Sequence, residues 1–391
     1  MKKSPWRAFA AALIVAAGFC FVTGVYVLGL TDKNATERDF IQYWAAGQQL
    51  VHGANPYDLA AILRIEQAAG LEGGQPKITF SPPVAFCFFL PLGYVGAKTG
   101  LILWLLLLLA GLSVAIWMLW ILQGRPQSRY HLLGYAFAPA LSCLMAGQLD
   151  VFLLLGIVLF LRLRDSRPFL AGAVLLPCAL KPHLFLPFAI VLLLWVASRR
   201  RYRLLGGFGA ALLGSCAATL CFAPALWPQY AQMMRGTRVL DVFIPTLSVA
   251  FRFLVDRQAA WLQFLPEAAG CVWAVWYYWT RRARWNWMEH GMLLLIVSVA
   301  CAPYAFFFDE TILLPAVLAG LYRAANSGRS LLPLGLIAAV ALIEVLAVVQ
   351  VTSPFYLWTV PAWLAWYLYA TGGRSEPAKE MRSGADCSIL L

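Results

Sequence analysis

The feature that most constrains this chain is a succession of apolar runs, some of them long enough to cross a lipid bilayer and several shorter, separated by short arginine clusters. A bilayer core requires roughly 20 apolar residues per helix. Of the 391 residues, 62% are hydrophobic and only 12% are charged, whereas soluble proteins carry about 25% charged residues. The sequence therefore predicts an all-α, polytopic membrane protein.

We expect about twelve membrane helices that bury one another, which predicts a single integral-membrane domain over residues 1–371. Residues 1–30 begin like a signal peptide, but their apolar run is long and has no clear cleavage site, which favours a retained first helix. A disordered cytoplasmic tail is expected at 372–391. The predicted spans are 8–30, 99–122, 131–147, 149–163, 169–181, 183–198, 204–222, 262–280, 289–307, 309–323, 331–351 and 355–371.

The net charge of +12 does not indicate nucleic-acid binding, because the basic residues lie in clusters at the ends of apolar runs. With both chain ends in the cytoplasm, most lysines and arginines fall on the inner side, as the positive-inside rule requires. We therefore expect a multi-pass protein of the plasma (inner) membrane. Most of its extramembrane mass, and hence its chemistry, is expected on the extracytoplasmic side.

The first extracytoplasmic loop, residues 31–98, is expected to carry interfacial helices. Asp39 is a candidate N-cap with Gln42 at capping-box spacing, Gly53 a candidate stop and Asp58 a second N-cap. The apolar segment near 80–95 is short, which favours a re-entrant or interfacial helix over a full span. The first helix of the loop has one apolar stripe, which predicts that it lies in the membrane interface; the stripe comprises Phe40, Tyr43, Trp44, Gly47, Leu50 and Val51.

Two polar positions at the outer membrane edge are candidates for chemistry. Asp39 is either a general base that activates a hydroxyl group or a simple N-cap. Lys181 and His183 flank a proline within an apolar stretch, where a lysine is costly. They either bind a phosphate group or reflect a lysine that snorkels to the interface.

Other polar residues have two interpretations each. Gln148 and Asp150 form a tight turn in which Asp150 is a candidate N-cap, and Asp309 with Glu310 either binds a sugar or cation or favours a helix start through the dipole. Glu344 belongs to a proton path or is a hydrogen-bonded structural acid. Arg235 and Arg238, in an outer loop, either meet anionic headgroups or are simply solvated.

Several classes of site are not indicated. No Walker loop or glycine-rich dinucleotide motif is present, and the nine cysteines show neither metal-ligand spacing nor a disulfide framework. We therefore expect no cofactor and no metal site, although acids beside a phosphate could recruit a divalent cation without a motif. Any donor is expected to be lipid-borne.

The sequence resembles glycosyltransferase family 87, whose members are polyprenol-phosphate-mannose-dependent mannosyltransferases of the GT-C superfamily. The resemblance spans most of residues 39–315, and its opening motif is the more specific part. At Ser81 the sequence departs from the family's usual Tyr-Pro-Pro, which leaves the acceptor open. The matching motifs are Asp39-Phe40, Tyr43-Trp44-Ala45-Ala46, Gly53-Ala54-Asn55-Pro56-Tyr57-Asp58, Phe80-Ser81-Pro82-Pro83, Pro91-Leu92, Gly147-Gln148, Lys181-Pro182 and Ala302-Pro303-Tyr304 with Asp309.

The resemblance implies a GT-C-like fold and transfer of a hexose, mannose in the family, with inversion. The donor would be a polyprenyl-phosphate-linked sugar and the acceptor a hydroxyl group of a glycan or glycolipid. Asp39 would be the general base, and Lys181 with His183 would meet the leaving phosphate. Gln148, Tyr57 and Asp309 are the further candidates for substrate or phosphate binding.

Two other functions remain open from the residues alone. A lipid or solute transporter or flippase also needs intramembrane charges such as Glu344 and Lys181, but transporters commonly show paired halves, and no internal symmetry is evident here. A non-catalytic membrane scaffold would leave the buried acids and Lys181 unexplained.

Overall fold

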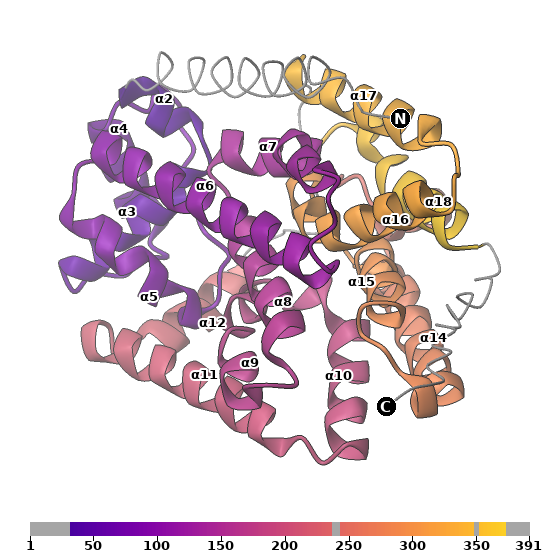
Figure 1. The fold of residues 1–391 in the computed structure, drawn as a ribbon. Helices are drawn as coiled ribbons and strands as arrows, with labels where there is room; N and C mark the ends of the chain where they lie inside the picture. Colours follow the sequence, from indigo (N-terminus) through magenta and orange to yellow (C-terminus); the bar gives the residue numbers. More distant parts are fainter. Residues whose placement is uncertain (1–31, 237–242, 348–351, 373–391) are drawn as a thin grey trace, which may run out of the picture.

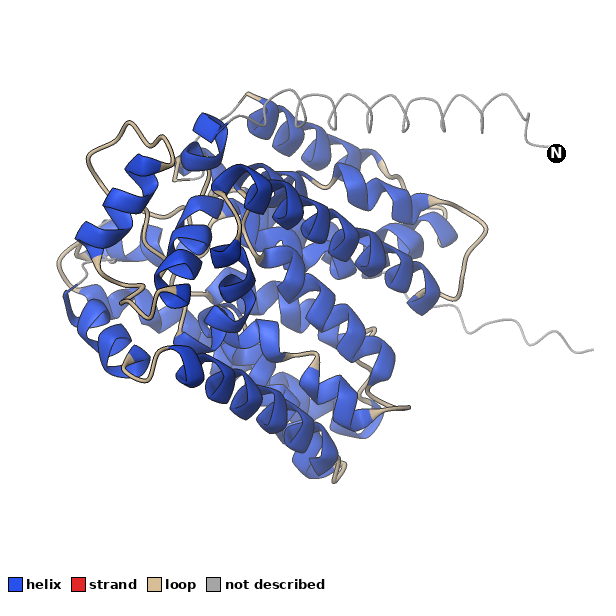
Figure 2. Cartoon of the chain, turned by 90° about the vertical axis from the view of Figure 1, so that its left-hand side faces the viewer, coloured by secondary structure: helices blue, strands red, loops and turns tan. Residues whose placement is uncertain are grey.

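The computed structural model describes residues 32–236, 243–347 and 352–372, and these are helical or irregular, with no β-strand among them. Figures 1 and 2 show the helices packed around one another, and the buried apolar side chains form a continuous cluster. The all-α prediction is confirmed. The predicted first helix at 8–30 and almost all of the predicted tail lie outside the described residues.

The helices begin and end at the following residues. The α-helices are α2 Asp32–Glu37, α3 Phe40–Val51, α4 Leu59–Ala68, α5 Phe86–Phe89, α6 Ala97–Leu122, α7 Ala138–Ala146, α8 Asp150–Leu163, α9 Pro168–Ala173, α10 Leu186–Ser198, α11 Tyr202–Phe222, α12 Leu226–Gly236, α13 Leu247–Val255, α14 Leu265–Arg281, α15 His290–Cys301, α16 Leu314–Asn326, α17 Leu332–Leu346 and α18 Thr359–Thr371. The short 3₁₀ helices are η1 Pro83–Ala85, η2 Leu90–Tyr94, η3 Tyr130–Ala136, η4 Leu176–Leu180, η5 Pro182–Leu184, η7 Ala260–Phe264, η8 Arg282–Arg284, η9 Phe307–Leu313 and η10 Pro354–Tyr356.

Among the described residues, two helices are long and apolar enough to cross a membrane, α6 with 26 residues and α11 with 21. At 1.5 Å per residue they are roughly 39 and 31 Å long. Five shorter apolar helical segments lie at 83–94, 168–180, 186–198, 290–301 and 332–346. The predicted number of twelve spans is therefore not confirmed.

Several predicted spans are broken where proline interrupts the helical hydrogen bonds. The run 131–147 divides into η3 and α7, with Pro139 in the first turn of α7. The run 169–181 divides into α9 and η4, with Pro177 in the first turn of η4. Proline has no backbone N–H and clashes with the preceding turn, so it is tolerated at a helix start but not inside a helix. Predicting these runs as unbroken helices was wrong.

Helix α3 is largely buried within the protein: nine of its 12 residues are buried. Its backbone meets η2 directly, since a Cβ atom on Gly47 would lie 2.4 Å from the carbonyl oxygen of Phe89, and one on Gly93 would lie 2.2 Å from that of Gly47. The apolar stripe of this helix therefore packs within the protein, and its placement at the membrane interface stays a prediction. Only glycine permits so close an approach of two backbones.

The ends of the loop helices follow the sequence prediction. Gly53 has a φ angle of 65° and follows the end of α3, as expected for a left-handed stop. The Asp58 carboxylate accepts hydrogen bonds from the N–H groups of Ala60 and Ala61, at 3.0 and 3.1 Å. The N-cap prediction for Asp58 is confirmed. Segment 80–95 forms η1, α5 and η2, which together make a short helical run at 83–94.

Candidate active site

The candidate site forms where the turn between α7 and α8 meets the start of α3. Gly147 ends α7 with a φ angle of 70°, and a Cβ atom on it would lie only 2.8 Å from Cβ of Phe40. The indole N–H of Trp104, on α6, donates to the carbonyl oxygen of Gly147 at 2.7 Å. The turn is thus fixed against α3 and α6, and this places Gln148 beside Asp39.

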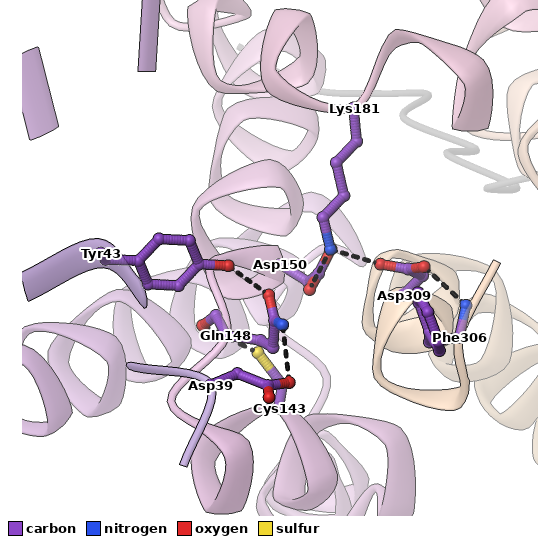
Figure 3. A network of polar contacts seen from close by, with 8 residues as sticks. All are labelled: Asp39, Tyr43, Cys143, Gln148, Asp150, Lys181, Phe306 and Asp309. Atoms are coloured by element: carbon purple, nitrogen blue, oxygen red, sulfur yellow. Dashed lines mark hydrogen bonds and ion pairs between the residues drawn. The ribbon is translucent and has the colours of Figure 1, made fainter. Parts of the chain in front are cut away.

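Asp39 does not cap α3. Its backbone is in the right-handed helical region, and its side chain makes no capping hydrogen bond. Instead its Oδ2 accepts a hydrogen bond of 2.9 Å from Nε2 of Gln148, as Figure 3 shows. The capping-box prediction was wrong, because a residue 109 positions away in the sequence takes the carboxylate.

The orientation of the Gln148 amide is fixed by Tyr43. The buried Tyr43 hydroxyl donates to Oε1 of Gln148 at 2.5 Å, which leaves Nε2 to face Asp39 (Figure 3). The thiol of Cys143 donates to the Gln148 carbonyl oxygen at 3.2 Å. Tyr43 therefore acts on Asp39 through Gln148. Within the described part of the chain, Oδ1 of Asp39 has no hydrogen-bond partner, and the residue is partly exposed.

Lys181 lies between two carboxylates. Its Nζ donates to both oxygens of Asp150 at 2.9 Å and to Oδ1 of Asp309 at 2.6 Å. Asp150 is fully buried and Asp309 is 1% exposed. An ammonium group has three N–H donors, and here all three face carboxylate oxygens. The pairing joins α8, the segment between η4 and η5, and η9.

Asp309 and Glu310 point to different partners and do not form one binding site. The other oxygen of Asp309 accepts the N–H of Phe306 at 2.7 Å. Glu310 accepts hydrogen bonds from the Thr359 hydroxyl at 2.5 Å and the Trp363 indole at 2.9 Å. Both oxygens of Glu310 are therefore held within the protein, which fits a structural acid.

The other sequence-predicted residues lie around this network or apart from it. His183 stacks on Tyr304 with ring centroids 3.9 Å apart. The Tyr57 hydroxyl donates to the carbonyl oxygen of Ser81 at 2.8 Å, and burial, with a smaller contribution from Tyr230, raises the pKa of Tyr57. Tyr57 makes no hydrogen bond to the network around Asp39 among the described residues.

Three further polar residues complete the comparison with the sequence. Glu344 accepts a hydrogen bond from the Trp358 indole at 3.3 Å, in line with a structural acid. Arg235 is exposed at the end of α12. Arg238 lies outside the described residues.

Two residues of the site were missed from the sequence. Tyr43 was assigned to an apolar stripe, although a residue four positions after Asp39 on a helix lies on the same side. Asp150 was interpreted as an N-cap, whereas it is the first residue of α8 and pairs with Lys181. The usable signal was the presence of an acid and a lysine at polar breaks in apolar runs, where unpaired charges are costly.

The described residues contain no group of three or more His, Cys, Asp or Glu side chains arranged to hold a metal ion. The carboxylates of the site instead pair with other side chains: Asp39 accepts a hydrogen bond from Gln148, and Asp150 and Asp309 form ion pairs with Lys181.

Comparison with protein families assigns the chain. Residues 80–303 match the family model of glycosyltransferase family 87. Neither the curated proteins nor the solved structures gave a significant match. The matched residues include the turn at Gln148 and the ion pair between Lys181 and Asp150. Because the match covers more than half of the sequence, the protein belongs to glycosyltransferase family 87 and is a glycosyltransferase.

Proposed function

We propose that the protein transfers a hexose, with mannose as the sugar that the family resemblance implies, from a polyprenyl-phosphate-linked donor to a hydroxyl group of a glycan or glycolipid acceptor. Asp39 is the general base. The observation that carries the proposal is the arrangement of its carboxylate: Oδ2 is held by Gln148, while Oδ1 has no hydrogen-bond partner among the described residues and the residue is partly exposed. A fixed but accessible carboxylate is what proton abstraction requires.

In this reaction Oδ1 of Asp39 takes the proton of the acceptor hydroxyl, and the hydroxyl oxygen attacks C1 of the sugar. The bond between C1 and the phosphate oxygen breaks, and the polyprenyl phosphate leaves with the electron pair. A phosphate is a stable anion, so its departure needs no general acid. Attack from the face opposite the phosphate inverts the configuration at C1.

The role of Lys181 is revised relative to the sequence prediction. Positive charge near the leaving phosphate would favour the transition state, but the ammonium group is already paired with Asp150 and Asp309. We assign Lys181 to holding these two carboxylates beside the base. Contact of Lys181 or His183 with the donor phosphate stays a prediction.

The membrane placement belongs to the same proposal. Helices α6 and α11 carry large exposed apolar side chains such as Leu106, Trp117 and Leu213, which suits contact with lipid. Helix α6 starts beside Phe40 and Trp44 and is followed by Arg125, while α8 starts at Asp150 and has Arg162 in its last turn. The positive-inside rule then puts the arginine end in the cytoplasm and Asp39 on the extracytoplasmic side. The twelve-span, multi-pass arrangement is retained as part of this proposal.

The test is transfer of labelled mannose from polyprenyl-phosphate-mannose by membranes that contain the wild type or Asp39→Asn. Asparagine keeps an oxygen that can accept the hydrogen bond from Gln148 but cannot act as a base, so transfer should fall by about 10²–10⁴-fold. Asp58→Asn makes the same chemical change at an exposed N-cap of the same loop, where asparagine caps equally well, and should transfer normally.

Two results would count against the proposal. Normal transfer by Asp39→Asn would exclude this carboxylate as the base. Absence of transfer by the wild type would exclude mannose on this lipid as the donor, and other polyprenyl-phosphate hexoses would be assayed next. Movement of lipid or solute across vesicles without any sugar transfer would favour the transporter hypothesis.

A further inference from the structure

A groove of about 530 Å³ lies between the ends of α6 and α8 that are farthest from Asp39. We call it the arginine groove and define it by six of its lining residues: Trp117, Ile121 and Arg125 from α6 and the turn after it, and Arg162, Leu163 and Arg167 from α8 and the loop after it. It takes no part in the site around Asp39.

Among the described residues, no acid balances the charge of the groove. Arg125, Arg162 and Arg167 are all exposed, and none has a carboxylate within ion-pair distance among the described residues. The acid in this region, Asp165, pairs instead with Arg164 at 3.3 Å and with Arg201 at 3.7 Å. Three guanidinium groups thus line one groove without a counter-ion from the described part of the chain, which makes the groove complementary to an anion.

Apart from Ser166, the other residues that line the groove are apolar. Trp117 and Ile121 are spaced by four residues, so they follow one face of α6, and Arg125 lies in the turn after it. Leu163 adjoins Arg162 at the end of α8. The Trp117 side chain is 53% exposed. A groove with cations at its mouth and apolar side chains behind them matches a molecule with an anionic head and a hydrocarbon chain.

The backbone holds Arg125 in a defined position at the mouth of the groove. It has a φ angle of 55°, after Gly124 with a φ angle of 81°. Its N–H donates to the carbonyl oxygen of Trp120 at 3.0 Å, and the Trp120 indole donates to the carbonyl oxygen of Pro126 at 3.1 Å. The turn that carries Arg125 is therefore tied to the last turns of α6.

We propose that the arginine groove binds an anionic glycerophospholipid of the cytoplasmic leaflet. The three guanidinium groups meet the headgroup phosphate, for which arginine offers paired N–H donors, and one acyl chain lies along Trp117, Ile121 and Leu163. Basic pockets between membrane helices on the cytoplasmic side are suited to anionic headgroups. The inference rests on the membrane placement proposed above but not on the identity of the sugar donor or the base.

The test is native mass spectrometry of the full chain in detergent, titrated with phosphatidylglycerol or with phosphatidylcholine of the same acyl chains. The wild type should bind phosphatidylglycerol more tightly. Replacement of Arg125, Arg162 and Arg167 together by glutamine should weaken this binding by about 100-fold, because each basic residue near an anionic lipid contributes about fivefold. Binding of phosphatidylcholine should change little.

The matched control replaces Arg200, Arg203 and Arg284 by glutamine. These arginines are exposed and lie outside the groove, and Arg200 shares the left-handed backbone of Arg125 with a φ angle of 53°. The control removes the same charge and should retain binding. Equal loss in both triple variants, or equal binding of the two lipids by the wild type, would overturn the proposal.

Two additions keep the test decisive. Competition with free glycerol 3-phosphate distinguishes a lipid from a soluble phosphate: displacement at concentrations similar to those of the lipid would overturn the assignment to a membrane lipid. If the triple variant does not fold, Arg167→Gln alone should weaken phosphatidylglycerol binding by about fivefold relative to Arg200→Gln. Lipid binding is measured without sugar transfer, so its failure is distinct from failure of the proposed reaction.

Discussion

The two ends of α6 and α8 carry charge in opposite ways. At the end near Asp39, Lys181 and its two carboxylates are joined at 2.6–2.9 Å, and both carboxylates are almost fully buried. At the arginine groove, three cations are exposed and have no carboxylate partner among the described residues. The first arrangement fixes geometry inside the protein, whereas the second leaves charge available for a ligand. A charge that is paired inside the protein is therefore structural, whereas a charge without a carboxylate partner is available to bind a ligand.

Removing one partner of the buried ion pairs is the strongest test of this comparison. Lys181→Met leaves Asp150 and Asp309 without their cation and should lower the unfolding free energy by about 3–5 kcal/mol. Arg200→Gln removes an exposed cation that lies outside the site and should change the unfolding free energy by less than about 0.5 kcal/mol. Thermal unfolding of both variants in the same detergent provides the measurement, and equal midpoints would contradict the structural role assigned to Lys181.

The next largest loss of stability is expected when the close packing of Gly147 against Phe40 is disturbed. Gly147→Ala combines a left-handed backbone with overlap against Phe40, and should cost about 1–2 kcal/mol for the backbone plus about 1–3 kcal/mol for the overlap. Gly53→Ala has the same backbone requirement, with a φ angle of 65°, but an added Cβ meets nothing within 4 Å. The difference in unfolding midpoint between the two variants isolates the contact that brings Gln148 to Asp39. Identical midpoints would mean that this contact is not needed.

The hydrogen bond that orients Gln148 should have a smaller effect on stability and a specific effect on catalysis. Tyr43→Phe leaves Oε1 of Gln148 buried without its donor, at a cost of about 1–3 kcal/mol. The turnover number should fall while KM for the acceptor changes little, because Tyr43 acts only through Gln148. Tyr94→Phe removes a hydroxyl from an exposed tyrosine of η2 and is the control. A fall in acceptor affinity alone would show that Tyr43 contacts substrate instead.

The smallest effect on stability is expected for Glu66. This acid is buried, and no cationic side chain forms an ion pair with it among the described residues. Its Oε2 accepts the backbone N–H of Lys77 at 3.0 Å, and burial raises its pKa from 4.5 to about 7. Between these values the folded protein holds a proton that the unfolded chain has released. The unfolding free energy therefore decreases as pH rises through this range, and the penalty is complete above the folded pKa.

Glu66→Gln should abolish this dependence, so that the variant gains about 1–2 kcal/mol over the wild type between about pH 5 and about pH 6.5. The measurement is the unfolding midpoint of both proteins across that range. The exposed Glu37→Gln is the control and should track the wild type. A constant difference between wild type and Glu66→Gln at all pH values would exclude titration of Glu66 as the cause.

The sequence was most informative where the controlling interactions are local. The helix predicted at 149–163 is found at Asp150–Leu163, and the one at 204–222 is found at Tyr202–Phe222. Gly53 and Asp58 end and begin helices as predicted, because stops and caps depend on a few neighbouring residues. The runs 131–147 and 169–181 were wrongly predicted as unbroken helices, because the prediction relied on their high average hydropathy and gave too little importance to the prolines within them.

The residues of the site could be predicted from the sequence, but the contacts between them could not. The sequence pointed to Asp39, Gln148, Lys181 and Asp309, all of which the structure places in contact with one another or with Asp150. It could not reveal the contacts themselves, since Lys181 pairs with residues 31 and 128 positions away. Local signals also misled: Asp39 and Asp150 have the spacing of helix caps, yet tertiary partners take both carboxylates.

The direct backbone contact between Gly47 and Gly93 has a consequence for how the enzyme can evolve. A side chain at either position would push α3, and with it Asp39, away from η2, so the two segments cannot diversify independently. The chain between them is freer, since an added Cβ at Gly74 would meet nothing within 4 Å and one at Gly73 would make only ordinary contact with the Leu71 side chain. Insertions and changes of length that alter the surroundings of the site without moving Asp39 are therefore expected to accumulate near residues 73–74.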